Sequence, residues 1–461
     1  INTFPALPNE GAVLFLKSPS YKIIHTVSYS DKWYNNPVKK IGGYSLEMVD
    51  SKNPCSGKTN WTASDNISGG TPGKLNSNHR VNIDESQPRI KKVYAADSVT
   101  IFIYFSEPID SIMASSILNY NIENINIESI TVIEPVFNVV KLRLTNSLEI
   151  SKVYTLSCNN IFDCAGNVVD RSKIKFGLHE IANSSDIVIN EILFNPNLAG
   201  IDFVEIYNRG SKLLDLKNIY IANKATDGSI NTPIQISLEG QTFYPGEFIV
   251  LSRDEEIVKR EYITMNPDCF LDISLPAFND DKGSVVILNS SGEILDEINY
   301  TEKWHFPLVV NAEGVSLERI HYQGSSDNKE YWTSASKSSG YATPSYKNSQ
   351  FLAGTESGGD VNVSPKIISP DNDGRDDFAI IEYKFKEPGM LCTIIIFDAS
   401  GRAVRYLQRN VLAGKEGSFK WDGLGEKLRK LPSGIYIVYT EAMSLKGKIE
   451  RYKNAIVLAD R

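Results

Sequence analysis

Apolar and polar residues alternate with a period of two along nearly the whole chain, and clusters of Asn, Asp, Gly, Ser and Pro interrupt this alternation. A period of two places successive side chains on opposite faces of a strand, so that one face can be buried. Residues 253–261 are the exception, because acidic residues at their start and basic residues at their end favour a short helix. We therefore predict an all-β chain of tandem sandwich domains.

Length and charge limit the functions open to the chain. A chain of 461 residues is too long for a single hydrophobic core, so several domains are expected. The content of 41% apolar and 23% charged residues is typical of folded domains. A net charge of −8 disfavours nucleic acid or an anionic membrane surface as a partner, because no basic stripe is present. The apolar runs are strand-sized, so we expect no transmembrane segment.

An internal repeat links the two ends of the first 350 residues. Trp33 matches Trp304, which lies 271 residues later. Further pairs are residues 43–47 with 314–318, Trp61 with Trp332, and, after a slip of one residue, 11–16 with 283–288, 71–72 with 343–344 and 76–77 with 348–349. The second copy also contains residues 187–208, for which the first copy has no counterpart. We therefore expect residues 1–79 to be the second half of a domain whose beginning lies outside this sequence.

The second copy carries a recognisable set of motifs. These are Ile-Asn-Glu at 189–191, Phe-Val-Glu-Ile-Tyr-Asn at 203–208, Gly-Val-Ser-Leu-Glu-Arg at 314–319, Trp332 and Gly-Tyr-Ala-Thr-Pro at 340–344. Residues 185–350 thereby resemble a bacterial lamin-tail domain, and residues 1–79 resemble a partial one. The resemblance implies an immunoglobulin-like β-sandwich, in which the tryptophans fill the core.

The segment between the two copies contains Phe-Ser-Glu-Pro at 105–108 and Asp-Cys-Ala-Gly-Asn at 163–167. With these motifs, residues 88–182 resemble the bacterial immunoglobulin-like domains of surface proteins. Such a domain is expected to place the first motif at a strand end and the second in a turn.

The last module follows a segment rich in Gly and acidic residues, 351–364, which predicts a flexible linker with few contacts. Residues 365–461 contain Ser-Pro-Asp-Asn-Asp-Gly at 369–374, Trp-Asp-Gly at 421–423 and Leu-Pro-Ser-Gly-Ile-Tyr at 431–436. This order resembles the C-terminal immunoglobulin-like module of flagellar hook-capping proteins. It is equally similar to the modules that sort proteins through the type nine secretion system of Bacteroidota.

Catalytic constellations are missing from the sequence. The five histidines are scattered without metal-ligand spacing, and the common nucleophile and phosphate-loop motifs are absent. Glu191 and Glu205, with Asp202, are an acidic candidate that neighbouring strands can bring together, and a structural role is favoured for them. We therefore predict that the chain is not an enzyme and has no cofactor other than, at most, calcium.

Two local patterns suggest further bonds. Asp371, Asp373, Asp376 and Asp377 surround a Gly turn, where carboxylates can wrap calcium; a hydrated tight turn is the favoured alternative. Cys158 and Cys164 flank a turn-like segment, which predicts a local disulfide in an oxidising compartment.

The sequence as a whole predicts a non-catalytic, modular cell-surface protein that acts as a spacer or docking component. Its expected partners are other cell-envelope or secretion-system proteins, and its expected place is the outer face of the outer membrane or the medium. Two alternatives stay open. The modules can be appendages of a secreted hydrolase whose catalytic domain precedes residue 1, or they can bind surface carbohydrate through exposed aromatic residues.

Overall fold

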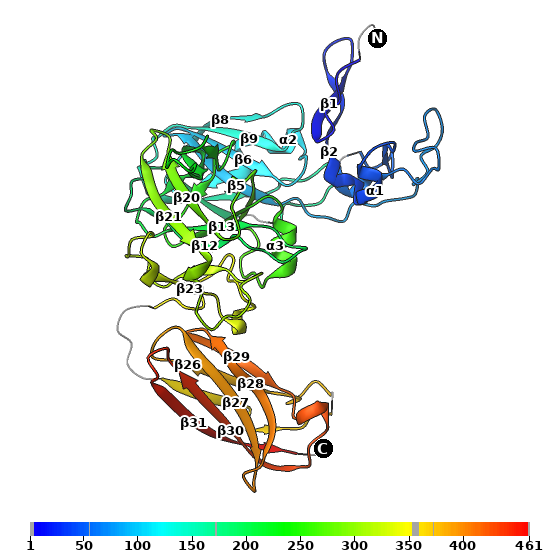
Figure 1. Ribbon diagram of the computed structural model, residues 1–461. Helices are drawn as coiled ribbons and strands as arrows, with labels where there is room; N and C mark the ends of the chain where they lie inside the picture. Colours follow the sequence, from blue (N-terminus) through cyan, green and yellow to red (C-terminus); the bar gives the residue numbers. More distant parts are fainter. Residues whose placement is uncertain (1–3, 55, 171–172, 353–358, 372, 460–461) are drawn as a thin grey trace. The chain divides into compact units, whose positions relative to one another are not determined.

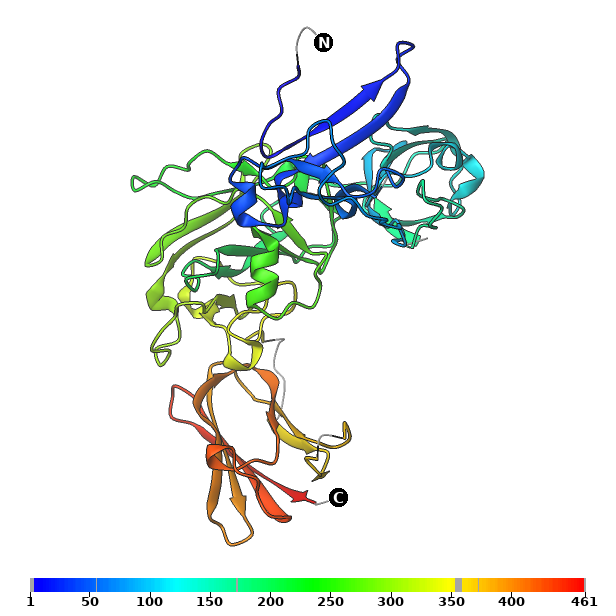
Figure 2. The same ribbon diagram turned by 90° about the vertical axis from the view of Figure 1, so that its right-hand side faces the viewer.

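A computed structural model describes residues 4–54, 56–170, 173–352, 359–371 and 373–459 (Figures 1 and 2). The chain divides into two compact units, Ile1–Glu180 and Ile181–Arg461, and each is considered on its own. Strands dominate both units, so the predicted all-β class of tandem immunoglobulin-like domains is confirmed. No helix in the described ranges has the length and apolar character that a membrane crossing requires.

The first unit begins with two separate strand pairs. We call residues 4–84 the half-copy, since they contain the partial repeat. The strand β1 (Gly11–Lys17) pairs with β2 (Ile23–Ser30), and β3 (Leu46–Met48) pairs with β4 (Trp61–Ala63). Between the pairs lie η1 (Asp31–Tyr34) and α1 (Pro37–Lys40), and η2 (Gly57–Asn60) precedes β4.

The remainder of the first unit is a two-sheet sandwich. One sheet has the order β5-β6-β9-β8 and the other β11-β10-β7, and their apolar faces meet in one core. The elements are β5 (Ile90–Asp97), β6 (Thr100–Phe105), α2 (Ser111–Ala114), η3 (Ile117–Asn119), β7 (Tyr120–Ile122), β8 (Ile127–Val132), β9 (Val139–Leu144), β10 (Val153–Cys158) and β11 (Lys173–Gly177).

The second unit opens with a larger sandwich. A six-stranded sheet of order β19-β18-β13-β12-β22-β23 faces a four-stranded sheet of order β16-β15-β20-β21, and β14 pairs with β17. The strands are β12 (Ile187–Leu193), β13 (Phe203–Asn208), β14 (Leu214–Asp215), β15 (Ile219–Ala222), β16 (Ile234–Gln235), β17 (Thr242–Phe243), β18 (Phe248–Ser252), β19 (Phe270–Asp272), β20 (Lys282–Asn289), β21 (Ile294–Thr301), β22 (Leu317–Arg319) and β23 (Trp332–Ser334). The predicted helix is α3 (Glu255–Glu261), which Asp254 caps. Short 3-10 turns are η4 (Leu216–Asn218), η5 (Glu302–Trp304), η6 (Lys329–Tyr331) and η7 (Lys337–Ser339).

The second unit ends in a second sandwich, coloured orange to red in Figure 1. Its sheets have the orders β24-β26-β29 and β25-β31-β30-β27-β28, and they enclose a core around the fully buried Trp421. The elements are β24 (Asp360–Ser364), β25 (Ile367–Ile368), β26 (Ala379–Lys384), β27 (Met390–Asp398), β28 (Ala403–Ala413), β29 (Glu416–Trp421), η8 (Glu426–Leu428), β30 (Gly434–Met443) and β31 (Ile449–Leu458).

The two sandwiches of the second unit contact each other closely, which contradicts the expected linker with few contacts. The buried amide of Gln350 donates to the carbonyl of Ala413 at 3.1 Å and accepts from the amide of Gly389 at 2.9 Å. Phe306 packs with Leu391 and Leu412 in a small apolar cluster. The Gly-rich composition of the linker predicted that the two sandwiches move independently. Gln350, just before the linker, instead binds the next sandwich through two hydrogen bonds. The predicted domain boundaries themselves stay predictions.

The repeat corresponds element by element. The pair β1–β2 matches β20–β21, and β3–β4 matches β22–β23 with the same partners, Glu47 opposite Thr62 and Glu318 opposite Thr333. The predicted pairing of residues 11–16 with 283–288 is wrong by one residue. A β-bulge follows Leu16 in one hairpin and Ile287 in the other, so the 271-residue spacing holds from β1 to β4. Two apolar runs of similar composition cannot reveal such a slip.

The predicted disulfide between Cys158 and Cys164 is also wrong. Cys158 is a free thiol, whereas Cys164 is disulfide-bonded. In β10, alternate side chains from Tyr154 to Cys158 face the core, so the Cys158 thiol is buried away from the turn that contains Cys164. This burial raises the pKa of the Cys158 thiol to about 12. Cys55 lies outside the described residues.

We expect alkylation of the denatured, unreduced protein to label Cys158, Cys269 and Cys392, because these thiols are free. The peptide that contains Cys164 should become labelled only after reduction. Peptide mass spectrometry distinguishes the two groups. A linked peptide pair joining Cys158 to Cys164 would show that the described arrangement is incorrect.

Candidate functional site

Three buried glutamates lie side by side across the six-stranded sheet of the second unit. Glu191 in β12 stands opposite Glu205 in β13 on one side and opposite Glu318 in β22 on the other. All three are fully buried. We call them the glutamate row. Like charges in directly opposed positions destabilise a sheet, so the row needs compensating contacts.

These contacts come mainly from residues 341–350, which we call the closing segment. Glu191 accepts from the amide of Thr343 at 2.8 Å, and Glu205 accepts from the amide of Ser345 at 2.6 Å. Glu318 accepts from the hydroxyl of Ser349 at 2.8 Å and from the amide of Gln350 at 2.9 Å. The glutamate row therefore holds the last part of the larger sandwich against the six-stranded sheet.

Burial sets the protonation of the glutamate row. It is the first cause that raises the pKa of all three carboxyls, and neighbouring carboxylates add to it at Glu191 and Glu205. The hydroxyl oxygen of Thr343 lies 2.8 Å from Glu318 Oε1 and 3.1 Å from Glu191 Oε2. A hydroxyl has one proton to donate, so both contacts are satisfied when one of these carboxyls is protonated. The arrangement is that of a structural clamp.

One of the three glutamates of this clamp has a counterpart in the half-copy. Glu47, the counterpart of Glu318, accepts from the hydroxyl of Thr71 at 2.6 Å and from the amide and hydroxyl of Ser77 at 2.8 and 2.7 Å. Burial raises the pKa of Glu47, but its hydrogen bonds outweigh burial and lower the pKa to about 2. Glu47 is thus also buried, 3% exposed, and accepts hydrogen bonds like those of Glu318.

The predicted acidic group is correct in part. Glu191 and Glu205 are cross-strand partners, as expected. Asp202 lies apart, where burial first and Asp280 second raise its pKa to about 6. The prediction missed Glu318, although the matched Gly-Val-Ser-Leu-Glu motif of the repeat was a signal for it.

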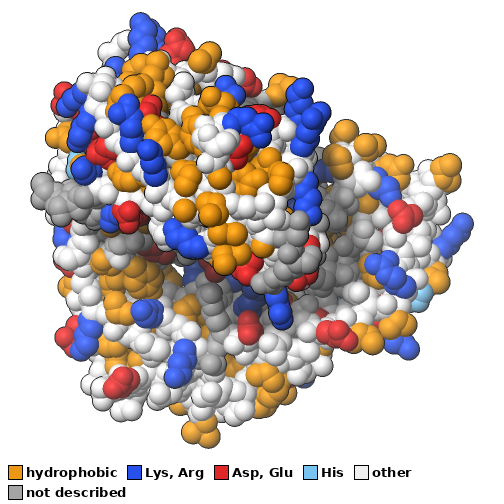
Figure 3. All heavy atoms as spheres, turned by 90° about the horizontal axis from the view of Figure 1, so that it is seen from below, with side chains coloured by type: hydrophobic (Ala, Val, Ile, Leu, Met, Phe, Trp, Pro, Cys, Tyr) orange, Lys and Arg blue, Asp and Glu red, His pale blue; other side chains and the backbone are white. Residues whose placement is uncertain are grey.

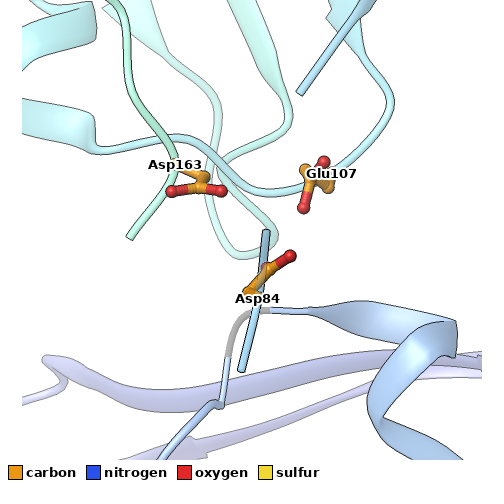
Figure 4. A group of neighbouring side chains, drawn as sticks. All are labelled: Asp84, Glu107 and Asp163. Carbon is orange, nitrogen blue, oxygen red and sulfur yellow. The ribbon is translucent and has the colours of Figure 1, made fainter. Parts of the chain in front are cut away.

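A second acidic group lies in the first unit, where Asp84, Glu107 and Asp163 approach one another (Figure 4). One oxygen of each lies within 4.8 Å of the others. Asp163 already accepts from the amides of Ala165 and Asn167, both at 2.8 Å, so it shapes the predicted turn. Calcium takes six to eight oxygens, more than this group has free. Burial, then Asp84 and Asp163, raises the pKa of Glu107 to about 7.

Three of the four predicted calcium ligands lie close together at the turn, and the fourth, Asp376, does not belong to this group. Asp371, Asp373 and Asp377 each bring one oxygen within 4.8 Å of the others. Their side chains accept from the backbone amides of Asp373, Arg375 and Gly374, respectively. Asp376 has positive φ and is not part of the group. The bonds fit the tight turn that was favoured, and calcium at this turn stays a prediction.

Three of the histidines lie against neighbouring side chains. His305, buried beside Ser334, has its pKa lowered to about 4 by burial, while His179 stacks on Tyr94 and His321 lies edge-on to Tyr331. The protein face drawn in Figure 3 intermingles basic, acidic and apolar side chains, so a broad basic surface is not seen among the described residues on that face.

The strand order of the larger sandwich and its motifs can now be set beside known proteins. Residues 180–302 match the Lamin Tail Domain family. This match covers β12 to β21 and thus includes Glu191 and Glu205, while the closing segment lies beyond it. We call the larger sandwich that this match identifies, residues 181–350, the lamin tail sandwich. No curated protein matches the chain.

Several solved structures show likenesses to parts of the chain. The N-terminal part of the bacterial S-layer protein SbsC is 21% identical, with 36% of this chain and 40% of that chain covered and a TM-score of 0.20. A DUF4876 family protein from Bacteroides thetaiotaomicron is 14% identical, with 45% and 87% covered and a TM-score of 0.20. Dimeric latent PorU from Porphyromonas gingivalis is 9% identical, with 82% and 33% covered and a TM-score of 0.19. These scores are too low to support an argument about function.

We expect Glu318→Ala to lower the free energy of unfolding of the second unit by about 3 kcal/mol, because it leaves buried donors of Ser349 and Gln350 without an acceptor. Denaturant unfolding measures this loss. Glu313→Ala, a change in the exposed loop just before β22, is the control and should alter stability by less than about 0.5 kcal/mol. Equal effects of both changes would show that the lamin tail sandwich does not depend on the clamp.

We expect the stability of the first unit to fall as pH rises from about 4.5 through about 7, because folding raises the pKa of Glu107 to about 7. Its protonated form is favoured in the folded state, so this contribution is complete at low pH and lost at high pH. Glu107→Gln should match the wild type at pH 4 and exceed it at pH 8. Hydrogen exchange of peptides from residues 88–180, corrected for intrinsic pH effects, measures the difference. Glu123→Gln, at an exposed position, should not reproduce the pattern.

Proposed function

We propose that the chain is a non-catalytic part of a bacterial surface protein, in which the lamin tail sandwich and the C-terminal sandwich act together as one rigid arm. The observation that carries this proposal is the joint at Gln350, whose amide bonds to both Ala413 and Gly389. The joint is reinforced by a hydrogen bond from the amide of Lys415 to the carbonyl of Ser349 at 2.6 Å. A rigid arm suits a spacer that holds another component at a fixed distance.

One edge strand of the C-terminal sandwich offers a docking edge. The strand β28 is long and lies at the edge of its sheet, where it pairs with β27 only on one side within the described residues. Arg409 covers the ring of Tyr406 at 3.7 Å on this strand. An exposed edge strand can accept a strand from a partner through its backbone groups. In β28 the amide of Tyr406 already donates to Glu426, and the carbonyl of Ala413 accepts from Gln350, so a partner strand would pair with the residues between them. We infer that β28 docks onto a component of the cell envelope or of the secretion machinery.

The alternatives have weaker support. For carbohydrate binding, the described structure contains a row of four rings, Phe248, Tyr207, Tyr322 and Phe351, with neighbouring centroids 4.1 to 4.7 Å apart. These rings stack on one another, so the stacked faces are not available to a sugar. For the hydrolase appendage, the catalytic domain is expected before residue 1, and no contact among the described residues supports it. This second alternative remains compatible with the arm as a spacer.

Export of a truncated chain tests the proposal. We expect deletion of residues 360–461 to retain the protein in the periplasm of its own bacterium, because the C-terminal sandwich is then missing as the docked module. Protease treatment of intact cells, followed by cell fractionation, measures surface display. A periplasmic reporter fused to residues 360–461 is the matched control and should appear on the surface. Normal display of the truncated chain would overturn the export role.

A further inference from the structure

The half-copy lacks neighbours that its counterpart has. In the lamin tail sandwich, β20 pairs with β15 as well as β21, and β22 pairs with β12 as well as β23. In the described part of the half-copy, β1 pairs with β2 alone and β3 with β4 alone. Figure 2 shows the β1–β2 hairpin in dark blue as a two-stranded ribbon. Two strand edges are therefore open at equivalent places.

The apolar face of the half-copy is open as well. Leu16 and Ile24 are both 61% exposed, whereas Ile287 and Leu295, at the corresponding positions, are 0% and 2% exposed. In the lamin tail sandwich these two residues belong to the main core, which β12, β13 and β15 complete. An isolated hairpin gains little stability in water, and exposed apolar patches mark interaction sites. Leu16 and Ile24 are thus core residues without the other half of their core.

A buried nitrogen identifies what is missing. His25 corresponds to Asp296, whose carboxylate accepts from the backbone amide of Ile189 in β12 at 2.7 Å. The His25 Nε2 atom is buried but has no hydrogen-bond partner among the described residues, and neither has the hydroxyl of Thr26. A buried polar atom without a partner is costly. A strand in the place of β12 brings an amide to this position.

We propose that residues 4–84 bind a second lamin-tail first half, a polypeptide segment with the strand pattern of residues 187–272, which completes a second lamin tail sandwich. The occupant is not the first half already present, because β12 and β15 of that segment are paired with β22 and β20. It adds one strand to the edge of β1 and another to the edge of β3, and it covers Leu16 and Ile24. The proposal does not depend on the rigid-arm function, which concerns the second unit.

A fusion within the full chain tests this proposal. Gly11 occupies the place of Lys282, so residues 181–281 joined directly to Gly11 reproduce the junction of the lamin tail sandwich. We expect the backbone amides of residues 15–18 and 46–47 in this fusion to exchange at least about tenfold more slowly than in the unfused chain. Hydrogen exchange with mass spectrometry measures the change.

Charged substitutions provide the control. Ile192→Asp and Ile221→Asp, made only in the added segment, place charges at core positions and should abolish the protection. Leu16→Asp with Ile24→Asp should leave the unfused chain folded, since both side chains are exposed there, but should abolish protection in the fusion. The proposal is wrong if the amides of β1 and β3 exchange equally fast in the fusion and in the charged controls. It is also wrong if Leu16→Asp with Ile24→Asp unfolds the half-copy without the added segment.

Discussion

The hydrogen bonds accepted by Glu318 are the constraint on which the second unit depends. The carboxylate fixes Ser349 and the amide of Gln350, and the side chain of Gln350 then holds the C-terminal sandwich. Closure of one sandwich and attachment of the next thus share a single buried acceptor. Glu47 shows that the hydrogen bonds form even without β12, whereas the raised pKa of Glu318 follows from its complete burial. The hydrogen bonds of the clamp come from a short segment, whereas the surrounding sandwich, by burying Glu318, sets the pKa of its carboxyl group.

Much of the fold could be predicted because it follows from local rules. Strand alternation gave the class, the charges of residues 253–261 gave α3, and the ordered motifs gave the repeat. Contacts that depend on three-dimensional placement were not predictable in this way. Cys158 and Cys164 are near in sequence, but the strand period points Cys158 into the core. The glycine-rich composition of a linker likewise does not predict the contact of the neighbouring Gln350 side chain with Ala413.

The candidate site was visible only in part, because a buried glutamate and a surface glutamate look alike in a sequence. Glu191 stands inside an apolar run, and Glu205 lies in an alternating strand, which allowed their pairing to be foreseen. Their role required the closing segment, which is more than 130 residues away in the chain. Nothing in local periodicity reports which amides a distant loop will bring. The repeat was the stronger guide, since it aligned Glu47 with Glu318 and Thr71 with Thr343.

The joint at Gln350 also has a mechanical consequence. When tension is applied to the C-terminal sandwich, its load passes through the short contacts of Ser349 and Gln350. These contacts lead to Glu318 and so into the centre of the six-stranded sheet. Under force, the joint should therefore be the first part of this connection to separate.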